Sequence, residues 1–87
     1  MVFSRFEEIL AWQKSKNLTI KLYNQFLENR DFGFRDQIQK ASVSIMNNIA
    51  EGFERQTKNE FRQFLFIPKG SCAEVRSMLF LALDPDL

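Results

Sequence analysis

At 87 residues the chain is expected to form one domain over residues 1–87, and a domain this small buries only about 60–65% of the surface exposed by its unfolded form. Twelve basic and eleven acidic residues give a formal charge of +1, which argues against strong non-specific binding to nucleic acid. The chain has ten Phe, one Trp and one Tyr, whose side chains present more bulky apolar surface than so small a core can bury. Some of these side chains are therefore expected to be buried between chains.

The N-terminal sequence and the cysteine content predict a cytoplasmic location. Cys72 is the single cysteine, which excludes an intrachain disulfide. Glu7 and Glu8 interrupt the apolar run that a signal peptide needs. No stretch approaches about 18 uncharged apolar residues, so neither a membrane span nor a membrane partner is expected.

The first predicted helix spans about residues 4–29. Ser4 and Glu7 have the spacing of a capping box, in which each side chain bonds a free backbone N–H of the first turn. The segment from Gln13 to Asn17 is polar and is expected to be exposed. Apolar residues recur at helical spacing through Phe6, Ile9, Trp12, Ile20, Tyr23 and Leu27. The same stripe is thickened by Leu10, Leu18, Leu22 and Phe26. A turn at Asn29–Gly33 is expected to end the helix, because glycine tolerates a positive φ.

The second predicted helix covers residues of about 34–51. Steps of four and three define its apolar face: Phe34, Ile38, Ala41, Ile45, Ile49 and Gly52. Small residues at Ala41, Ser42 and Ser44 allow a neighbouring helix to approach closely. Gly52 is expected to be the C-terminal cap.

The third predicted helix covers residues of about 57–83 and starts with a capping box of Thr57 and Glu60. Its seam has the spacing of a coiled-coil-like bundle: Phe61, Leu65, Pro68, Cys72, Val75, Leu79 and Ala82. Further apolar residues lie off this seam, as in Phe66 and Phe80. A helix that is apolar on more than one face is buried on more than one side, so one side is expected to meet another chain or a further helix.

Pro68 interrupts this pattern, because proline inside a helix removes a hydrogen bond and its ring meets the carbonyl of Phe64. Either the helix is continuous with a kink, or it breaks and Ser71 begins a separate segment. The seam keeps its phase across Pro68, which favours the kink.

Catalysis and metal binding lack the residues that they need. The chain has no histidine, which removes the commonest general base and transition-metal ligand, and one cysteine cannot build a zinc site. Lys69-Gly70-Ser71 lacks the upstream glycine and the strand of a phosphate-binding loop. A non-enzyme without a cofactor is expected.

Asn47, Asn48 and Glu51 flank Ile49 and Ala50 on the second predicted helix. Near a buried face they would form a polar network that sets helix register. Near a helix end they would instead be capping or solvated residues. Both interpretations stay open, and neither is catalytic.

A basic stripe follows the second predicted helix and enters the third. It consists of Arg55, Lys58, Arg62 and Lys69. Such a stripe contacts phosphates in some nucleic-acid-binding proteins. Glu54 and Glu60 dilute its charge, which favours a solvated face instead.

Several motifs, in order along nearly the whole chain, resemble the "four helix bundle protein" family. Its members include proteins encoded in intervening sequences of bacterial 23S ribosomal RNA genes. The matching segments are Phe6-Glu7-Glu8-Ile9, Trp12-Gln13-Lys14, Asp36-Gln37-Ile38, Ala41 to Ile45, Asn48 to Phe53, Phe61 to Leu65 and Gly70 to Glu74.

This resemblance implies an antiparallel, up-and-down, left-handed bundle of four helices, commonly assembled as a homopentamer and without enzymatic activity. A more distantly similar bundle is the nucleic-acid-binding accessory protein of certain reverse transcriptases, which is basic, unlike this chain. The expected function is therefore a self-associating scaffold or binding module. The alternative is an accessory protein that binds RNA or DNA through the basic stripe.

The chain departs from the family pattern in two places. Pro68 stands where members usually have a small residue. The chain stops at Asp84-Pro85-Asp86-Leu87, where members continue into a fourth helix. Three helices of the four-helix pattern are therefore expected. Either the chain is a truncated member, or an intermolecular contact replaces the packing of the fourth helix.

Overall fold

The computed structural model describes residues 5–55 and 57–87, and within these ranges every regular element is a helix. The elements are a 3-10 turn η1 (Phe6–Glu8) and the helices α1 (Leu10–Gln25), α2 (Phe32–Phe53), α3 (Lys58–Phe64) and α4 (Phe66–Ala82). The predicted all-α helical bundle is confirmed.

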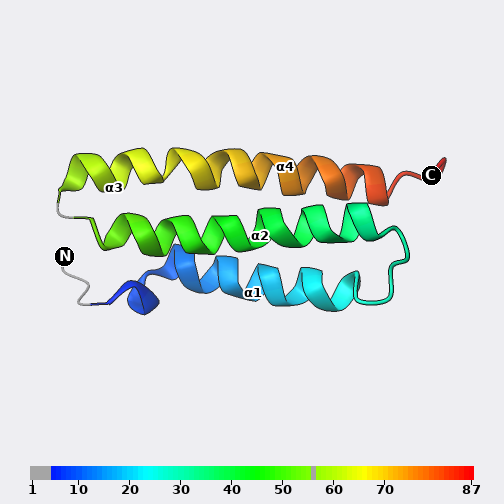
Figure 1. The fold of residues 1–87 in the computed structure, drawn as a ribbon, viewed down its shortest axis with the longest axis horizontal. Helices are drawn as coiled ribbons and strands as arrows, with labels where there is room; N and C mark the ends of the chain where they lie inside the picture. The colour runs from blue at the N-terminus through cyan, green and yellow to red at the C-terminus, as the bar shows by residue number, and fades with distance from the viewer. Residues whose placement is uncertain (1–4, 56) are drawn as a thin grey trace.

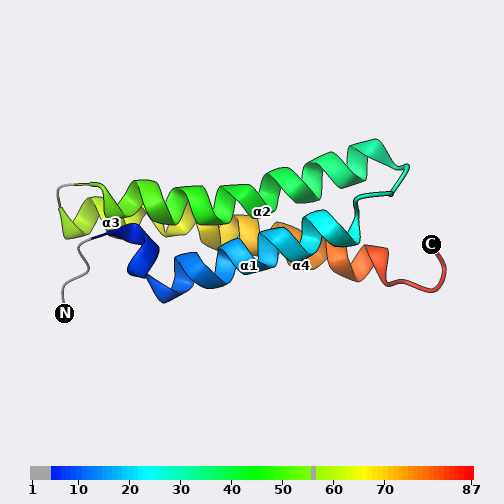
Figure 2. The same ribbon diagram turned by 90° about the horizontal axis from the view of Figure 1, so that it is seen from below.

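The helices pack as three antiparallel rods, up, down and up (Figure 1). α2 is the central rod; α1 packs along it on one side, and α3 and α4 follow one line on the other. In the view turned by 90°, α1 and α4 both lie below α2, so the three rods form a triangle in cross-section (Figure 2). Across the described residues no Cα atom of α1 lies within 8 Å of one in α4, so α2 joins the two outer rods.

The first helix begins later than predicted. Ile9 is extended, with φ −75° and ψ 122°, and separates η1 from α1. Gln13 Nε2 donates to the Glu7 carbonyl at 2.8 Å and ties the two elements together. The break lets the rings of Phe6 and Trp12 meet edge to face at 5.1 Å, which two residues six apart in one continuous helix cannot do. Ser4, the predicted cap, lies outside the described residues.

The predicted apolar stripe of the first helix is buried only in part: Leu22 and Phe26 belong to the core, and Ile9, Trp12 and Leu18 pack against it. Ile20, Tyr23 and Leu27 are exposed. The buried positions step by four, three and four through Ser15, Thr19, Leu22 and Phe26. Small hydroxyl side chains are buried here because they let α1 lie close to α2. Thr19 Oγ1 donates to the Ser15 carbonyl at 2.8 Å and lies 3.2 Å from the Ser42 carbonyl of α2, so its polarity is satisfied.

The second helix is longer at both ends than predicted. Asp31 is its N-cap, and its Oδ1 accepts from the Phe34 N–H at 3.1 Å. Gly33 therefore lies in the first helical turn, and no described glycine has a positive φ. Gly52 is buried inside α2 and is not the cap, a position held by Glu54. The predicted apolar face is confirmed, with all members buried except the half-buried Phe34.

The third rod starts as predicted, with Thr57 Oγ1 accepting from the Glu60 N–H at 3.1 Å. It is not one continuous helix, because Leu65 separates α3 from α4. Pro68 has no N–H to offer the Phe64 carbonyl, so the ladder is interrupted at that point. Leu65 keeps near-helical dihedrals, φ −76° and ψ −16°, and both pieces follow one line. The alternative of a separate segment beginning at Ser71 is wrong.

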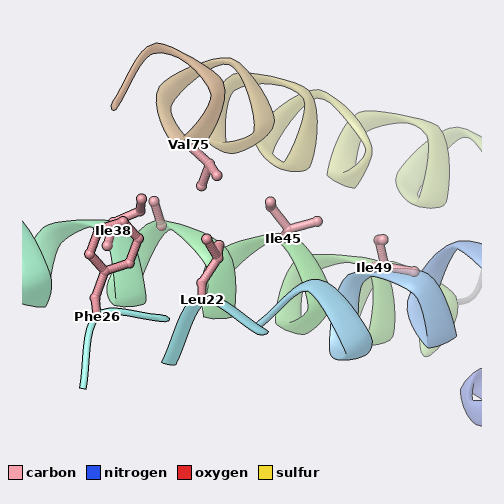
Figure 3. Close-up of a cluster of buried hydrophobic side chains, with 7 residues drawn as sticks. Leu22, Phe26, Ile38, Ile45, Ile49 and Val75 are labelled. Atoms are coloured by element: carbon pink, nitrogen blue, oxygen red, sulfur yellow. The ribbon is translucent and has the colours of Figure 1, made fainter. Parts of the chain in front are cut away.

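The hydrophobic core draws side chains from all three rods (Figure 3). Ile38 and Ile45 of α2 lie beside Leu22 of α1 and Val75 of α4, and Ile49 lies further along α2. The cluster contains seven buried apolar residues, of which four belong to α2. The middle rod therefore supplies most of the core.

Candidate interaction surface

An apolar groove runs between α1 and α4, with α2 as its floor. We call it the α1/α4 groove. Its volume is about 340 Å³, and its apolar lining consists of Ala11, Leu18, Ile45, Ile49, Leu65 and Pro68. Ser15 and Cys72 also face it. The groove lies where the backbones of the two outer rods stay apart, since no described Cα atom of α1 comes within 8 Å of one in α4.

The rims of the α1/α4 groove are basic. Lys14 lines it from α1 and Lys69 from α4, and no acidic residue is among its described lining. Lys21 and Arg76 follow seven residues further along the same helices, outside the groove lining, and the Arg76 guanidinium lies 5.9 Å from the centre of the Phe80 ring. α1 has no acidic residue anywhere in its length. The groove thus combines an apolar floor with positive edges.

The predicted seam of the third rod is buried at only some of its positions. Pro68 and Val75 are buried as expected. Leu65 and Cys72 are exposed, because they face the groove and not the core. Across the groove from these two seam residues lie Ala11, Lys14, Ser15 and Leu18 of α1.

A second apolar surface lies on α4 away from the core. We call it the outer face of α4, and it consists of Phe66, Ile67, Phe80 and Leu81. Phe66 and Phe80 are 66% and 68% exposed, and Ile67 and Leu81 are about half exposed. Position 80 is two heptads beyond 66, and 81 is two beyond 67, so each pair shares a stripe.

Polar side chains join α2 to α4 on the opposite side from the groove. Asn48 Nδ2 donates to the Ser44 carbonyl at 2.8 Å and to Ser44 Oγ at 3.1 Å, and Ser71 Oγ donates to the same Oγ at 3.1 Å. Of the three residues considered for a network, Asn48 therefore takes part in one. Asn47 and Glu51 are exposed.

The four residues of the basic stripe are all exposed, but the structure divides them. Arg55 lies in the α2–α3 connection with its guanidinium 4.4 Å from the centre of the Phe64 ring. Lys58 and Arg62 belong to α3. Lys69 belongs to the rim of the α1/α4 groove instead.

Within the described ranges, no three His, Cys, Asp or Glu side chains come together as a metal-binding group. In the same ranges, no helix combines the length and the apolar character that a bilayer span requires.

A family profile described as "23S rRNA-intervening sequence protein" matches residues 7–87. The chain belongs to this family. The match covers every helix of the structure, and the helical packing agrees with the fold that the motifs implied. Neither the curated proteins nor the solved structures contain a significant match to this family member.

Sequence reasoning missed the α1/α4 groove in this family member. Half of its wall comes from α1, where Ser15 was expected to be solvated and Leu18 was expected to belong to the buried stripe. One signal was available: sixteen residues of α1 contain three lysines and no carboxylate.

Proposed function

We propose that this chain acts as a non-catalytic, self-associating helical module, a scaffold or binding unit of the intervening-sequence protein family. The outer face of α4 carries the proposal. Two Phe and two aliphatic side chains stand in paired stripes on a helix whose opposite side already packs on α2. The two apolar pairs lie about 21 Å apart along the helix, with Ala73 and Glu74 between them on the same stripes. Large exposed apolar side chains repeated along one helix face are typical of a surface that is covered in an assembly.

The total accessible surface supports the same proposal. A compact chain of 10.3 kDa exposes about 5,350 Å² by the usual scaling with mass, whereas this chain exposes 6,661 Å². The excess is about 1,300 Å², and a standard interface buries about 800 Å² on each partner. The chain therefore has enough surplus surface for at least one stable interface.

The resemblance noted above implies a homopentamer, and we adopt it as the assembly to test. Sedimentation velocity over protein concentrations from about 1 to 100 μM measures the mass of the assembly. We expect a species larger than a monomer that persists in high salt, because apolar burial is not screened by ions. A folded monomer over the whole range contradicts self-association.

A pair of variants locates the interface. The double change Phe66→Ser and Phe80→Ser is expected to shift the protein toward monomer while keeping its helical circular dichroism. Phe32→Ser is the matched control, because Phe32 is 59% exposed but lies at the start of α2. Equal effects of the two changes would place the interface elsewhere.

A further inference from the structure

We propose that the outer face of α4 packs against a different face of a second copy of this chain, an exposed apolar stripe on α1. We call it the α1 stripe, and it consists of Ile20, Tyr23 and Leu27. The inference rests on the proposed self-association and adds which two surfaces meet. None of the residues of either surface lines the α1/α4 groove, so the contact does not compete for the place that a fourth helix of the family pattern fills.

The α1 stripe is apolar and exposed. Ile20 and Tyr23 stand on α1, and Leu27 lies in the turn that follows it. Their steps of three and four place them on one side, and all three side chains are exposed. The helix meets the core through Leu22 and Phe26 instead. The chain thus presents a second exposed apolar face, apart from the outer face of α4.

The outer face of α4 has bulky ends and a low middle. Its two apolar pairs stand about 21 Å apart. Between them, the exposed positions that step by four and three from Phe66 to Phe80 are small: Gly70, Ala73 and Ser77. A Cβ atom built on Gly70 would have no neighbour within 4 Å. The low middle is long enough to receive the α1 stripe, whose seven-residue span covers about 10 Å.

Neither surface is suited to pair with itself. Two outer faces of α4 whose bulky ends meet would place small residues opposite small residues, which leaves an unfilled space at the centre. Two α1 stripes would bring together helices that carry three lysines each and no carboxylate, so like charges would meet. A bulky stripe seated in a low middle fills the space, and the two surfaces that meet are therefore different ones.

A contact between two different faces repeats from copy to copy. Each chain then buries both of its exposed apolar faces, which amounts to about 1,600 Å² for two standard interfaces. The surplus of about 1,300 Å² derived above is of the same order. Such a contact closes into a ring when its rotation allows, and a ring of five copies needs a contact of this kind, because a twofold contact joins copies only in pairs.

Two variants test the pairing by blocking one face each. Ala73→Arg fills the low middle of the outer face of α4 with a long side chain. The double change Ile20→Ser and Leu27→Ser removes most of the α1 stripe. Each is expected to weaken self-association at least about thirtyfold. All three positions are exposed, so the helical circular dichroism is expected to stay unchanged.

The equimolar mixture of the two variants is the main measurement. The Ala73→Arg protein keeps its α1 stripe and the double variant keeps its outer face of α4, so one unimpaired contact forms between them. Sedimentation velocity is expected to show a species of two copies and nothing larger, at a concentration where each variant alone is a monomer. Leu10→Ser is the matched control, because Leu10 is 59% exposed on α1 but lies outside the α1 stripe, and it is expected to leave the wild-type assembly unchanged.

The outcomes separate this pairing from self-association itself. A wild-type protein that stays monomeric would remove the proposed function and the pairing together. If the wild type assembles, the pairing alone is overturned by a double variant that assembles like the wild type, by a mixture of folded variants that stays monomeric, or by an equal loss in Leu10→Ser. Should Ala73→Arg lose its helical circular dichroism, Phe66→Ser with Phe80→Ser takes its place and is expected to complement the double variant in the same way.

Discussion

Gly52 of α2 and Phe64 of α3 lie so close that a Cβ atom built on the glycine would be 2.7 Å from the Phe64 Cβ. The same atom would lie 2.9 Å from Cδ1 of Phe61. Gly52 is therefore a contact glycine inside a helix, where the absence of a side chain lets α3 fold back on α2.

Gly52→Ala is expected to destabilise the protein by about 1–3 kcal/mol, because one end of the contact is a Cβ atom near the backbone, which cannot rotate away. Chemical denaturation followed by far-UV circular dichroism measures this. An increase in stability would mean that α3 shifts away from α2 without a loss of packing energy.

Gly70→Ala supplies the opposite outcome. Gly70 lies inside α4, and a Cβ atom built there would have no neighbour within 4 Å. Alanine then adds only its higher helix propensity, so we expect a stabilisation of about 0.5–1 kcal/mol in the same denaturation experiment. A loss of stability at this position would indicate that its surroundings are closed by contacts in the assembly.

Ser42 tests the close approach of α1 to α2. Its side chain is completely buried, and its Oγ donates only to the local Gln39 carbonyl at 2.8 Å. Ser42→Ala is expected to change stability by less than about 1 kcal/mol, whereas Ser42→Leu is expected to cost about 1–3 kcal/mol through overpacking. Chemical denaturation followed by circular dichroism measures both changes. Similar denaturation midpoints for the two variants would show that α1 moves away from α2 at no cost.

Pro68→Ala is expected to join α3 and α4. The new N–H at position 68 is able to donate to the Phe64 carbonyl, and the clash of the ring is removed, so we expect a gain of about 1 kcal/mol after the lost packing of the buried ring. Amide exchange at positions 64–68 measures the closure directly. Unchanged exchange there would mean that Leu65 interrupts the rod for a reason other than the proline.

The basic stripe is expected to bind RNA weakly. Its four cations are divided between two places, and four phosphate contacts give a slope of at most about −3 for log affinity against log salt on single strands. Arg62→Ala is expected to reduce that slope by about 1. Titration of a structured RNA over a series of salt concentrations measures both. Tight binding in about 150 mM salt would contradict this and favour the nucleic-acid alternative.

The apolar periodicity of residues 34–52 predicted the central helix well, because its face is made of large aliphatic side chains at regular steps. The same reasoning failed on α1. Ser15 and Thr19 are buried because their small hydroxyl groups donate to backbone carbonyls and allow close packing. A prediction from residue polarity alone places such residues in solvent. The exposed apolar residues of α1 then appeared to be the core.

The groove was beyond prediction for a different reason. Its floor comes from α2 and its walls from segments some fifty residues apart, so it depends on which rods pack together. The seam spacing of residues 61–82 indicates a packed face without saying that part of it faces open space. Pro68 was visible in the sequence, but the interruption falls three residues earlier, at Leu65, because proline disrupts the turn that precedes it.

α2 makes the direct helix contacts to both outer rods, and each outer rod adjoins it through a short connection. The fold is thus two hairpins that share a middle helix, and the rods that pack on each other are consecutive along the chain. Such a chain is expected to fold fast. It also opens in parts: α1 has room to detach while α2 and α4 stay paired, so native-state amide exchange should report a lower opening free energy for α1 than for α2.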